Sequence, residues 1–196
     1  MNRPKLKNIF IEYSNKNSSL HPGSCSEDNI VIFLAGPTPS YPLAQISWRD
    51  SLANYLDNAI NKQKIGHKKI ILICPEPYER NWSFGPDDQI CWEHLWLERS
   101  NVILFWHETR WKPNRQTLIN CYHGSDMANI GIQFRFEVGM YIADLRKIRI
   151  FYVPPHAEGV AGVEWWIKNK PDNLLSIVRT EFDTANDVLS AIYRLS

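Results

Sequence analysis

The chain has 196 residues, a net charge of +1, and 44% hydrophobic and 22% charged residues, which is ordinary for a globular protein. The length suffices for one sizeable domain, and the small net charge gives no case for a nucleic-acid or membrane partner. No apolar run is long enough to span a bilayer, and no signal-peptide core follows the basic N-terminus. The four cysteines include no Cys-x-x-Cys pair, which argues against a metal site or disulfides and predicts a cytoplasmic protein.

The first 29 residues are predicted to form an N-terminal arm. Within it, Ile9–Tyr13 alternates enough for an edge strand, and residues 14–29 are rich in Ser and Asn, as in a loop. Residues 30–196 are predicted to form a single domain.

Apolar strands alternate with helices throughout that domain. Strands are expected at Ile30–Ala35, Ile70–Cys74, Val102–Trp106, Ile148–Val153 and, weakly, Leu175–Val178. Helices are expected at about 46–62 with Ser47 as N-cap, at 86–99, from about 130 to 145, at 164–168, and at 184–195 with Asp183 as cap. Residues 107–129 are polar and irregular and are predicted to form a long loop. This alternation predicts an α/β fold, a three-layer sandwich around a mainly parallel five-stranded sheet with a possible extra N-terminal edge strand.

Glu137 is an acidic residue within a mostly apolar stretch, Phe134–Tyr141. On a helical wheel it lies beside Tyr141, at the margin of an apolar stripe that includes Val138, Ile142 and Leu145. Desolvating a carboxylate costs free energy unless it has a partner or a function. Glu137 is therefore a candidate nucleophile or acid/base group, and a structural ion pair is the alternative.

Glu93 is the second candidate carboxylate. On a helix it shares a face with Ile90 and Leu97, so we expect it at the edge of the core. The helices that carry Glu93 and Glu137 both follow strands of a parallel sheet and begin near its carboxyl edge, where ligands bind. Two carboxylates in one pocket suit cleavage of a glycosidic bond. A helix-surface or salt-bridged acid is the alternative for each.

Other loop residues could contact a ligand at the same edge. Gly36 would let the backbone approach a ligand closely, and Thr38 or Ser40 could hydrogen-bond a sugar or a phosphate; a simple turn is the alternative. Arg49, at the start of the next helix, could bind an anion or could be an ordinary surface arginine.

Five segments fall in an order that resembles the nucleoside 2-deoxyribosyltransferase family, specifically its branch of 2-deoxyribosyltransferase-like proteins. They are Ile32-Phe33-Leu34-Ala35-Gly36-Pro37-Thr38-Pro39, Ser47-Trp48-Arg49, Asp88-Gln89-Ile90-x-Trp92-Glu93, Val102-Ile103-Leu104-Phe105-Trp106 and Phe136-Glu137-x-Gly139. The resemblance covers about residues 30–155. It implies a flavodoxin-like sheet and a homodimer or larger oligomer in which a neighbouring subunit helps to close the site.

The resemblance implies that Glu137 is the nucleophile and that Glu93 positions the sugar and assists proton transfer. No cofactor is needed for that chemistry. The substrate-binding residues implied by the motifs are Phe33, Gly36, Pro37, Thr38, Arg49, Asp88, Gln89 and Trp92. The expected function is cleavage or transfer at the N-glycosidic bond of a (deoxy)nucleoside or nucleotide, through a covalent glycosyl-glutamate intermediate.

The chain departs from the family pattern in three places. Phe33 stands where the transferases commonly have Tyr, Asn101 stands where an Asp is common, and residues 126–133 lack the usual Pro-Gly/Thr-Thr run. The changed loop and Phe33 leave one alternative open, a nucleotide-binding or regulatory module with weak or lost catalysis. A further alternative is an NAD-type glycohydrolase, since a catalytic Glu on a similar sheet could cleave the nicotinamide bond.

Overall fold

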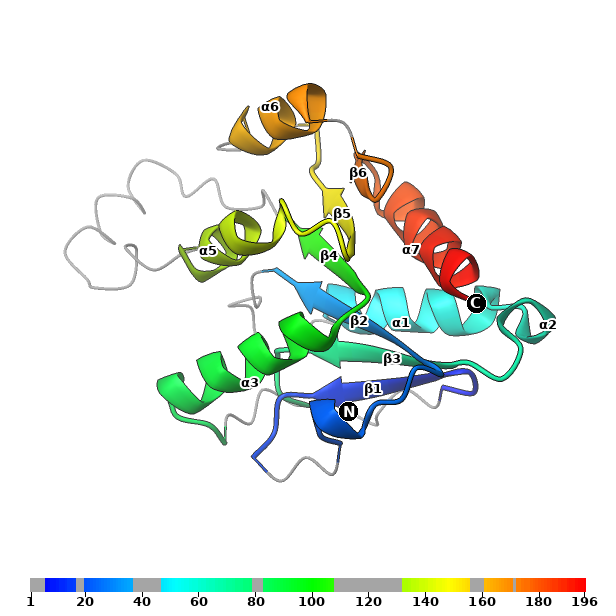
Figure 1. Ribbon diagram of the computed structural model, residues 1–196. Helices are drawn as coiled ribbons and strands as arrows, with labels where there is room; N and C mark the ends of the chain where they lie inside the picture. Colours follow the sequence, from blue (N-terminus) through cyan, green and yellow to red (C-terminus); the bar gives the residue numbers. More distant parts are fainter. Residues whose placement is uncertain are drawn as a thin grey trace.

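Six parallel strands form the central sheet of the protein, in the order β1-β3-β2-β4-β5-β6 (Figure 1). The strands are β1 (Ile9–Tyr13), β2 (Asn29–Ala35), β3 (Lys69–Cys74), β4 (Val102–Trp106), β5 (Ile148–Tyr152) and β6 (Leu175–Val178). This computed structural model describes residues 6–16, 20–36, 47–78, 83–107, 132–155, 161–170 and 172–196, with only the backbone described for 132–136.

The strand order is that of a flavodoxin-like fold with one strand added. If β2 is counted as the first strand, the five strands other than β1 stand in the order second, first, third, fourth, fifth. The direction of this order reverses between β2 and β4. The additional strand, β1, pairs with β3 at the edge of the sheet. The predicted parallel sheet with an extra N-terminal edge strand is confirmed.

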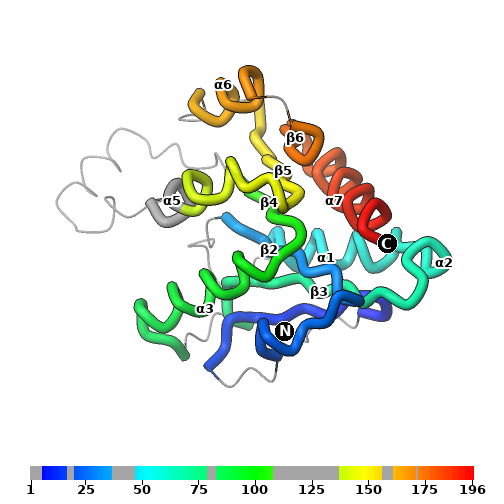
Figure 2. Tube along the Cα trace, viewed as in Figure 1, coloured from blue at the N-terminus to red at the C-terminus, as the bar shows by residue number. Residues whose placement is uncertain are grey.

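Helices cover both faces of the sheet and make three layers (Figures 1 and 2). They are α1 (Trp48–Ala59), α2 (Lys62–Ile65), α3 (Pro86–Arg99), α5 (Ile132–Tyr141), α6 (Ala161–Asn169) and α7 (Glu181–Leu195), with a short 3-10 helix η1 (Pro22–Ser24) before β2. Helices α1 and α7 pack on one face, through residues such as Leu56 and Val188. Helices α3, α5 and α6 pack on the other, through residues such as Trp96 and Tyr141.

The central strands β2, β3 and β4 are apolar after their first residue or throughout, because both of their faces are covered. In β2, Ile32 and Leu34 face the α1 and α7 layer, whereas Val31 and Phe33 face the α3 and α5 layer. All four side chains are at most 1% exposed. Each such side chain contributes about 1.5–3 kcal/mol through burial, so the sheet is a rigid platform for the loops that leave it.

Several predicted helix boundaries differ from the structure, and helix α6 spans Ala161–Asn169 where 164–168 was expected. Helix α1 begins after the expected N-cap Ser47, but it ends at Ala59. Helix α5 ends at Tyr141, and Leu145, which was expected to lie in its apolar stripe, is 68% exposed.

The assignment of Asp183 as the cap of the last helix is wrong. Helix α7 begins at Glu181, and the hydroxyl of Thr180 accepts a hydrogen bond of 3.0 Å from the backbone N–H of Asp183. Thr180 is therefore the N-cap, because its hydroxyl satisfies an N–H group that the first turn leaves free. The expected loop at 107–129 lies, beyond His107, outside the described residues.

Candidate functional site

The candidate site lies at the carboxyl ends of β2 and β4, where the strand order reverses. Gly36 follows β2 with a φ of +154°, and a Cβ at this position would lie 2.8 Å from the carbonyl oxygen of Trp106 and 3.2 Å from Cζ2 of Trp48. Glycine is therefore required here because two neighbouring elements approach the backbone closely. Pro37 and Thr38, which were expected to extend this part of the site, lie outside the described residues.

Stacked aromatic rings support the Gly36 turn from the α1 side. The rings of Trp48 and Trp106 stack at 4.5 Å between centroids with an angle of 9°, and Tyr152 packs on Trp106 at 4.1 Å. The guanidinium of Arg49 lies 4.6 Å above the Trp48 ring. These contacts hold the ends of β2, β4 and β5 together with the start of α1.

Arg49 is 1% exposed, so its interpretation as a surface arginine is wrong. Its Nε donates to the carbonyl of Leu34 at 3.1 Å, and one terminal nitrogen donates to the carbonyl of Gly36 at 2.7 Å. The other terminal nitrogen donates to Oε2 of Glu76 at 3.2 Å. The anion that Arg49 contacts is thus a protein carboxylate, and Arg49 positions the end of β2.

Glu76 is a buried acid at this edge that the sequence analysis did not single out. It is 5% exposed, and its Oε2 also accepts a hydrogen bond of 3.0 Å from the hydroxyl of Ser47. Its signal in the sequence is its place between Pro75 and Pro77, directly after a buried strand. A charged residue that is buried directly after a strand needs a partner, and only the tertiary structure identifies this partner as Arg49.

Glu93 and Gln89 lie one turn apart on α3, and both are buried, with exposed fractions of 7% and 8%. Nε2 of Gln89 donates to Oε1 of Glu93 at 2.6 Å and to the carbonyl of Pro75 at 3.0 Å. Oε1 of Gln89 accepts a hydrogen bond from the hydroxyl of Ser14, the residue that follows β1. Both amide hydrogens of Gln89 are used, so its side chain holds Glu93 in one orientation against the sheet.

The pKa of Glu93 lies above its usual value. Burial raises it, whereas the hydrogen bond from Gln89 and the charge of Arg49 lower it by smaller amounts. A carboxyl group in this environment keeps its proton to a higher pH than a solvated one. Glu93 is therefore suited to hold and donate a proton.

Asp50 is a second acid that the sequence analysis did not single out. Burial raises its pKa, and the hydroxyl of Tyr13 donates a hydrogen bond of 2.8 Å to its Oδ1. The charge of Glu76 also raises this pKa, and the charge of Arg49 lowers it. Asp50 thus extends the polar network of the site toward the end of β1.

Asp88 and Trp92 lie one turn apart on α3 in different surroundings. Asp88 is exposed, and its carboxylate lies 3.7 Å from Nζ of Lys16. Trp92 is half-buried between Phe84, at 6.4 Å between ring centroids, and Trp96, at 6.2 Å. Asp88 is therefore on the surface, whereas Trp92 is part of an aromatic cluster.

Glu137 is half-buried on α5, which lies on the same face of the sheet as α3 (Figure 1). Tyr141, one turn later, donates a hydrogen bond of 3.0 Å to Oε1 of Glu98 on α3 and lies 3.3 Å from Nδ1 of His94. Burial and Glu98 raise the pKa of Tyr141, and the charge of Glu137 raises it further. Helices α3 and α5 therefore contact each other through Tyr141 and Glu98, which lie at or near the C-terminal ends of the two helices.

The expectation that Ile90 lies on the core-facing side of α3 is wrong. Ile90 was expected there with Glu93 and Leu97, but it is 54% exposed, whereas Glu93 and Leu97 are buried. Phe33 is 0% exposed and lies wholly inside the core, beneath the site. Asn101 lies at the amino end of β4, where its Oδ1 accepts a hydrogen bond of 2.8 Å from the N–H of Val31.

A search of protein-family models and a search of curated proteins each found no match for this chain. Within the described ranges, no group of three or more His, Cys, Asp or Glu residues could hold a metal ion. No helix of the described part is long and apolar enough to cross a membrane.

Proposed function

We propose that this protein cleaves or transfers at the N-glycosidic bond of a (deoxy)nucleoside or nucleotide, with Glu137 as nucleophile and Glu93 as proton donor. The observation that carries the proposal is the burial of Glu93. Its carboxyl group has a raised pKa, it is oriented by Gln89, which also bonds to the end of β3, and its helix contacts that of Glu137 through Glu98 and Tyr141. The order of the five sequence motifs supplies the assignment of roles.

The proposed reaction has two steps. The Glu137 carboxylate attacks the anomeric carbon, the bond from this carbon to the base nitrogen breaks, and the base leaves with the bonding electrons and a proton from Glu93. A new base or water then attacks the anomeric carbon and releases Glu137, while Glu93 takes up the proton of the incoming group. A carboxyl group with a raised pKa suits both roles of Glu93, because it exchanges its proton closer to neutral pH.

The second candidate is a nucleotide-binding or regulatory module with weak or absent catalysis. Phe33 favours it, since this side chain is fully buried and offers no hydroxyl group at the position where the transferases commonly have Tyr. This candidate predicts ligand binding without release of a base.

The deciding experiment is mass spectrometry of the intact and digested protein after incubation with deoxynucleosides, deoxynucleotides and NAD. We expect a mass increment on the peptide that contains Glu137, together with free base in solution. Glu137→Gln should abolish both while the fold is retained. Glu27→Gln is the matched control, because Glu27 is an exposed acid at the other end of the sheet, and this variant should behave as the wild type.

The outcomes separate the alternatives. Binding without base release or a mass increment would support the binding module, and release of nicotinamide alone would support the glycohydrolase. Full turnover by Glu137→Gln would contradict the nucleophile assignment.

We also infer from the resemblance that the protein acts in the cytoplasm as a homodimer or larger homo-oligomer. A neighbouring subunit would then help to close the site over the nucleoside. Light scattering coupled to size-exclusion chromatography would measure the mass of the particle in solution. A monomer with full turnover would show that the site does not need a neighbouring subunit.

A further inference from the structure

Ser14 is connected to the candidate acid Glu93 through one intermediate side chain, Gln89. Ser14 directly follows β1, and its hydroxyl donates to Oε1 of Gln89, whose Nε2 donates to Oε1 of Glu93 at 2.6 Å. All three side chains are buried, and Ser14 is only 1% exposed. Because water does not reach these groups freely, the loss of one hydrogen bond leaves a buried polar atom without that partner.

The orientation of the Gln89 amide follows from its surroundings. The carbonyl oxygen of Pro75 can only accept a hydrogen bond, so the group 3.0 Å from it must be the NH₂ group of Gln89. The amide oxygen of Gln89 then lies on the other side of the group, where a buried oxygen needs a donor. The Ser14 hydroxyl supplies this donor.

Ser14 is itself fixed at the carboxyl end of β1. The pairing of β1 with β3 extends to Tyr13 and Cys74, and the backbone N–H of Ser14 donates to the carbonyl of Cys74 at 2.9 Å. Successive side chains of a strand point to opposite faces of its sheet. Accordingly, the hydroxyl of Tyr13 bonds to Asp50 on α1, whereas that of Ser14 bonds to Gln89 on α3. The end of β1 therefore connects both helical layers.

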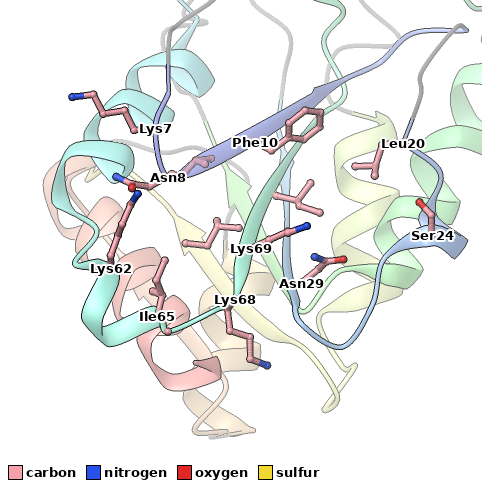
Figure 3. A pocket seen from close by; sticks show the side chains of 14 residues that line it. Lys7, Asn8, Phe10, Leu20, Ser24, Asn29, Lys62, Ile65, Lys68 and Lys69 are labelled. Carbon is pink, nitrogen blue, oxygen red and sulfur yellow. The ribbon is translucent and has the colours of Figure 1, made fainter.

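The amino end of β1 is anchored as well. The carboxylate of Asp57 on α1 accepts hydrogen bonds of 2.6–3.0 Å from the backbone N–H groups of Lys7 and Asn8. Figure 3 shows this end of the strand, where Lys7, Asn8 and Phe10 line a pocket of about 600 Å³. Because β1 is bonded to α1 at both ends and pairs with β3 along its length, it is a firm support for Ser14.

The residues after Ser14 lie beside the start of α3. The backbone N–H of Lys16 donates to the hydroxyl oxygen of Ser83 at 3.0 Å, and its Nζ lies 3.7 Å from the carboxylate of Asp88. The charges of Lys16 and Asp88 are exposed, so this ion pair contributes little stability. Together with the contact of Ser14, however, these contacts place the end of β1 against the helix that carries the candidate acid.

We propose that Ser14 is a positioning residue for Glu93, acting through Gln89, so that the added strand β1 supports the candidate acid. Ser14 fixes the amide of Gln89, and this amide in turn limits the Glu93 carboxyl group to one orientation. The catalytic part of this inference rests on the proposed function, in which Glu93 donates a proton to the leaving base. The connection from Ser14 to Glu93 can be tested without turnover.

The first test is an NMR titration of the Glu93 side-chain carboxyl carbon in the wild type and in Ser14→Ala. The hydrogen bond from Gln89 and the charge of Arg49 lower the pKa of Glu93 against the larger effect of burial. Ser14→Ala should loosen Gln89 and weaken its hydrogen bond, so the pKa of Glu93 should rise. The rise should be smaller than in Gln89→Met. In the Gln89→Met background, Ser14→Ala should cause no further rise, because the connection is already broken.

The matched control is Ser100→Ala. Ser100 is also buried, at 3% exposed, and its hydroxyl donates to the carbonyl of Trp96 at 2.7 Å at the end of α3. This variant loses a comparable hydrogen bond but should leave the Glu93 titration unchanged. Ser14→Cys is a second variant of the tested position. It keeps a weak S–H donor, so it should raise the pKa of Glu93 by less than Ser14→Ala does.

Measurements of turnover separate this inference from the proposed function. With Glu93 as proton donor, kcat/KM falls as the pH rises through the pKa of Glu93. Ser14→Ala should therefore move this fall to higher pH, and it should lower kcat by about tenfold because the donor is less well placed. Absence of base release by the wild type would overturn the catalytic part together with the proposed function, whereas the titration decides the connection by itself.

Three results would overturn the connection regardless of turnover. They are an unchanged Glu93 titration in folded Ser14→Ala and Ser14→Cys, an equal shift in Ser100→Ala, and an undiminished shift from Ser14→Ala in the Gln89→Met background.

Discussion

Gln89 and Glu93 form the central contact of the candidate site, with Nε2 of Gln89 donating to Oε1 of Glu93 at 2.6 Å. The same amide bonds to Ser14 and Pro75, which follow β1 and β3. The candidate acid is thus tied to the carboxyl edge of the sheet through one neutral side chain, and several properties of the protein should depend on that side chain.

Replacing Gln89 by methionine should raise the pKa of Glu93. The hydrogen bond from Gln89 lowers this pKa against the larger effect of burial, so its loss leaves burial less opposed. NMR titration of the Glu93 side-chain carboxyl carbon would measure the change. The matched control is Gln63→Met, an exposed position on α2, which should leave the Glu93 titration unchanged.

Replacing Glu93 by glutamine should stabilise the protein at neutral pH relative to the wild type. Because the pKa of Glu93 is raised in the folded state, the folded protein binds this proton more tightly than the unfolded chain. The resulting stability is fully present below the ordinary pKa of 4.5 and is lost as the pH rises through the raised value. Urea unfolding at a series of pH values would show the two proteins diverging above about pH 4.5; parallel curves would contradict the assignment.

Replacing Arg49 by methionine should destabilise the fold by about 3–5 kcal/mol, because it removes a buried ion pair with the Glu76 carboxylate while the carboxylate stays buried. Urea unfolding measures the loss. The double variant Arg49→Met/Glu76→Met should cost less than the sum of the two single variants, since no isolated charge remains.

Arg146→Met is the control for Arg49→Met. Arg146 also pairs with a carboxylate, Asp144 at 2.8 Å, but its side chain is 76% exposed. Water screens such a pair, so the unfolding midpoint should change little. A large loss at Arg146 or a negligible one at Arg49 would contradict the role of burial.

Replacing Gly36 by alanine should destabilise the protein by about 1–3 kcal/mol, through the close approach of its Cβ to Trp106 and an unfavourable φ. Gly85→Ala is the control, because nothing lies within 4 Å of a Cβ there. This change should stay within about 0.5 kcal/mol. Thermal unfolding of the two variants and the wild type would measure both effects.

Much of the fold follows from local sequence patterns. Strands β2, β3 and β4 contain short apolar runs that are followed by Gly, Pro or a polar residue, and a run such as Val102–Trp106 has few alternatives to a buried strand. Element ends were less well predicted. Thr180 and Asp183 are both good N-caps, and only the backbone geometry selects Thr180.

The candidate site was predicted in part. Glu93 was found as an acid near apolar residues, but Glu76 and Asp50 were not, because their burial results from contacts distant in sequence. The prediction that Ile90 lies on the core-facing side of α3 with Glu93 was also wrong. A helical wheel cannot tell how far the sheet extends beneath a helix.

The sequence by itself determined the α/β class, the parallel sheet and the positions of its strands, because alternation and apolar runs are properties of neighbouring residues. The tertiary structure alone decided that Arg49 pairs with Glu76 rather than with solvent. Burial, pKa values and ion pairs depend on residues far apart in the chain, so they become defined only when the strands and helices pack.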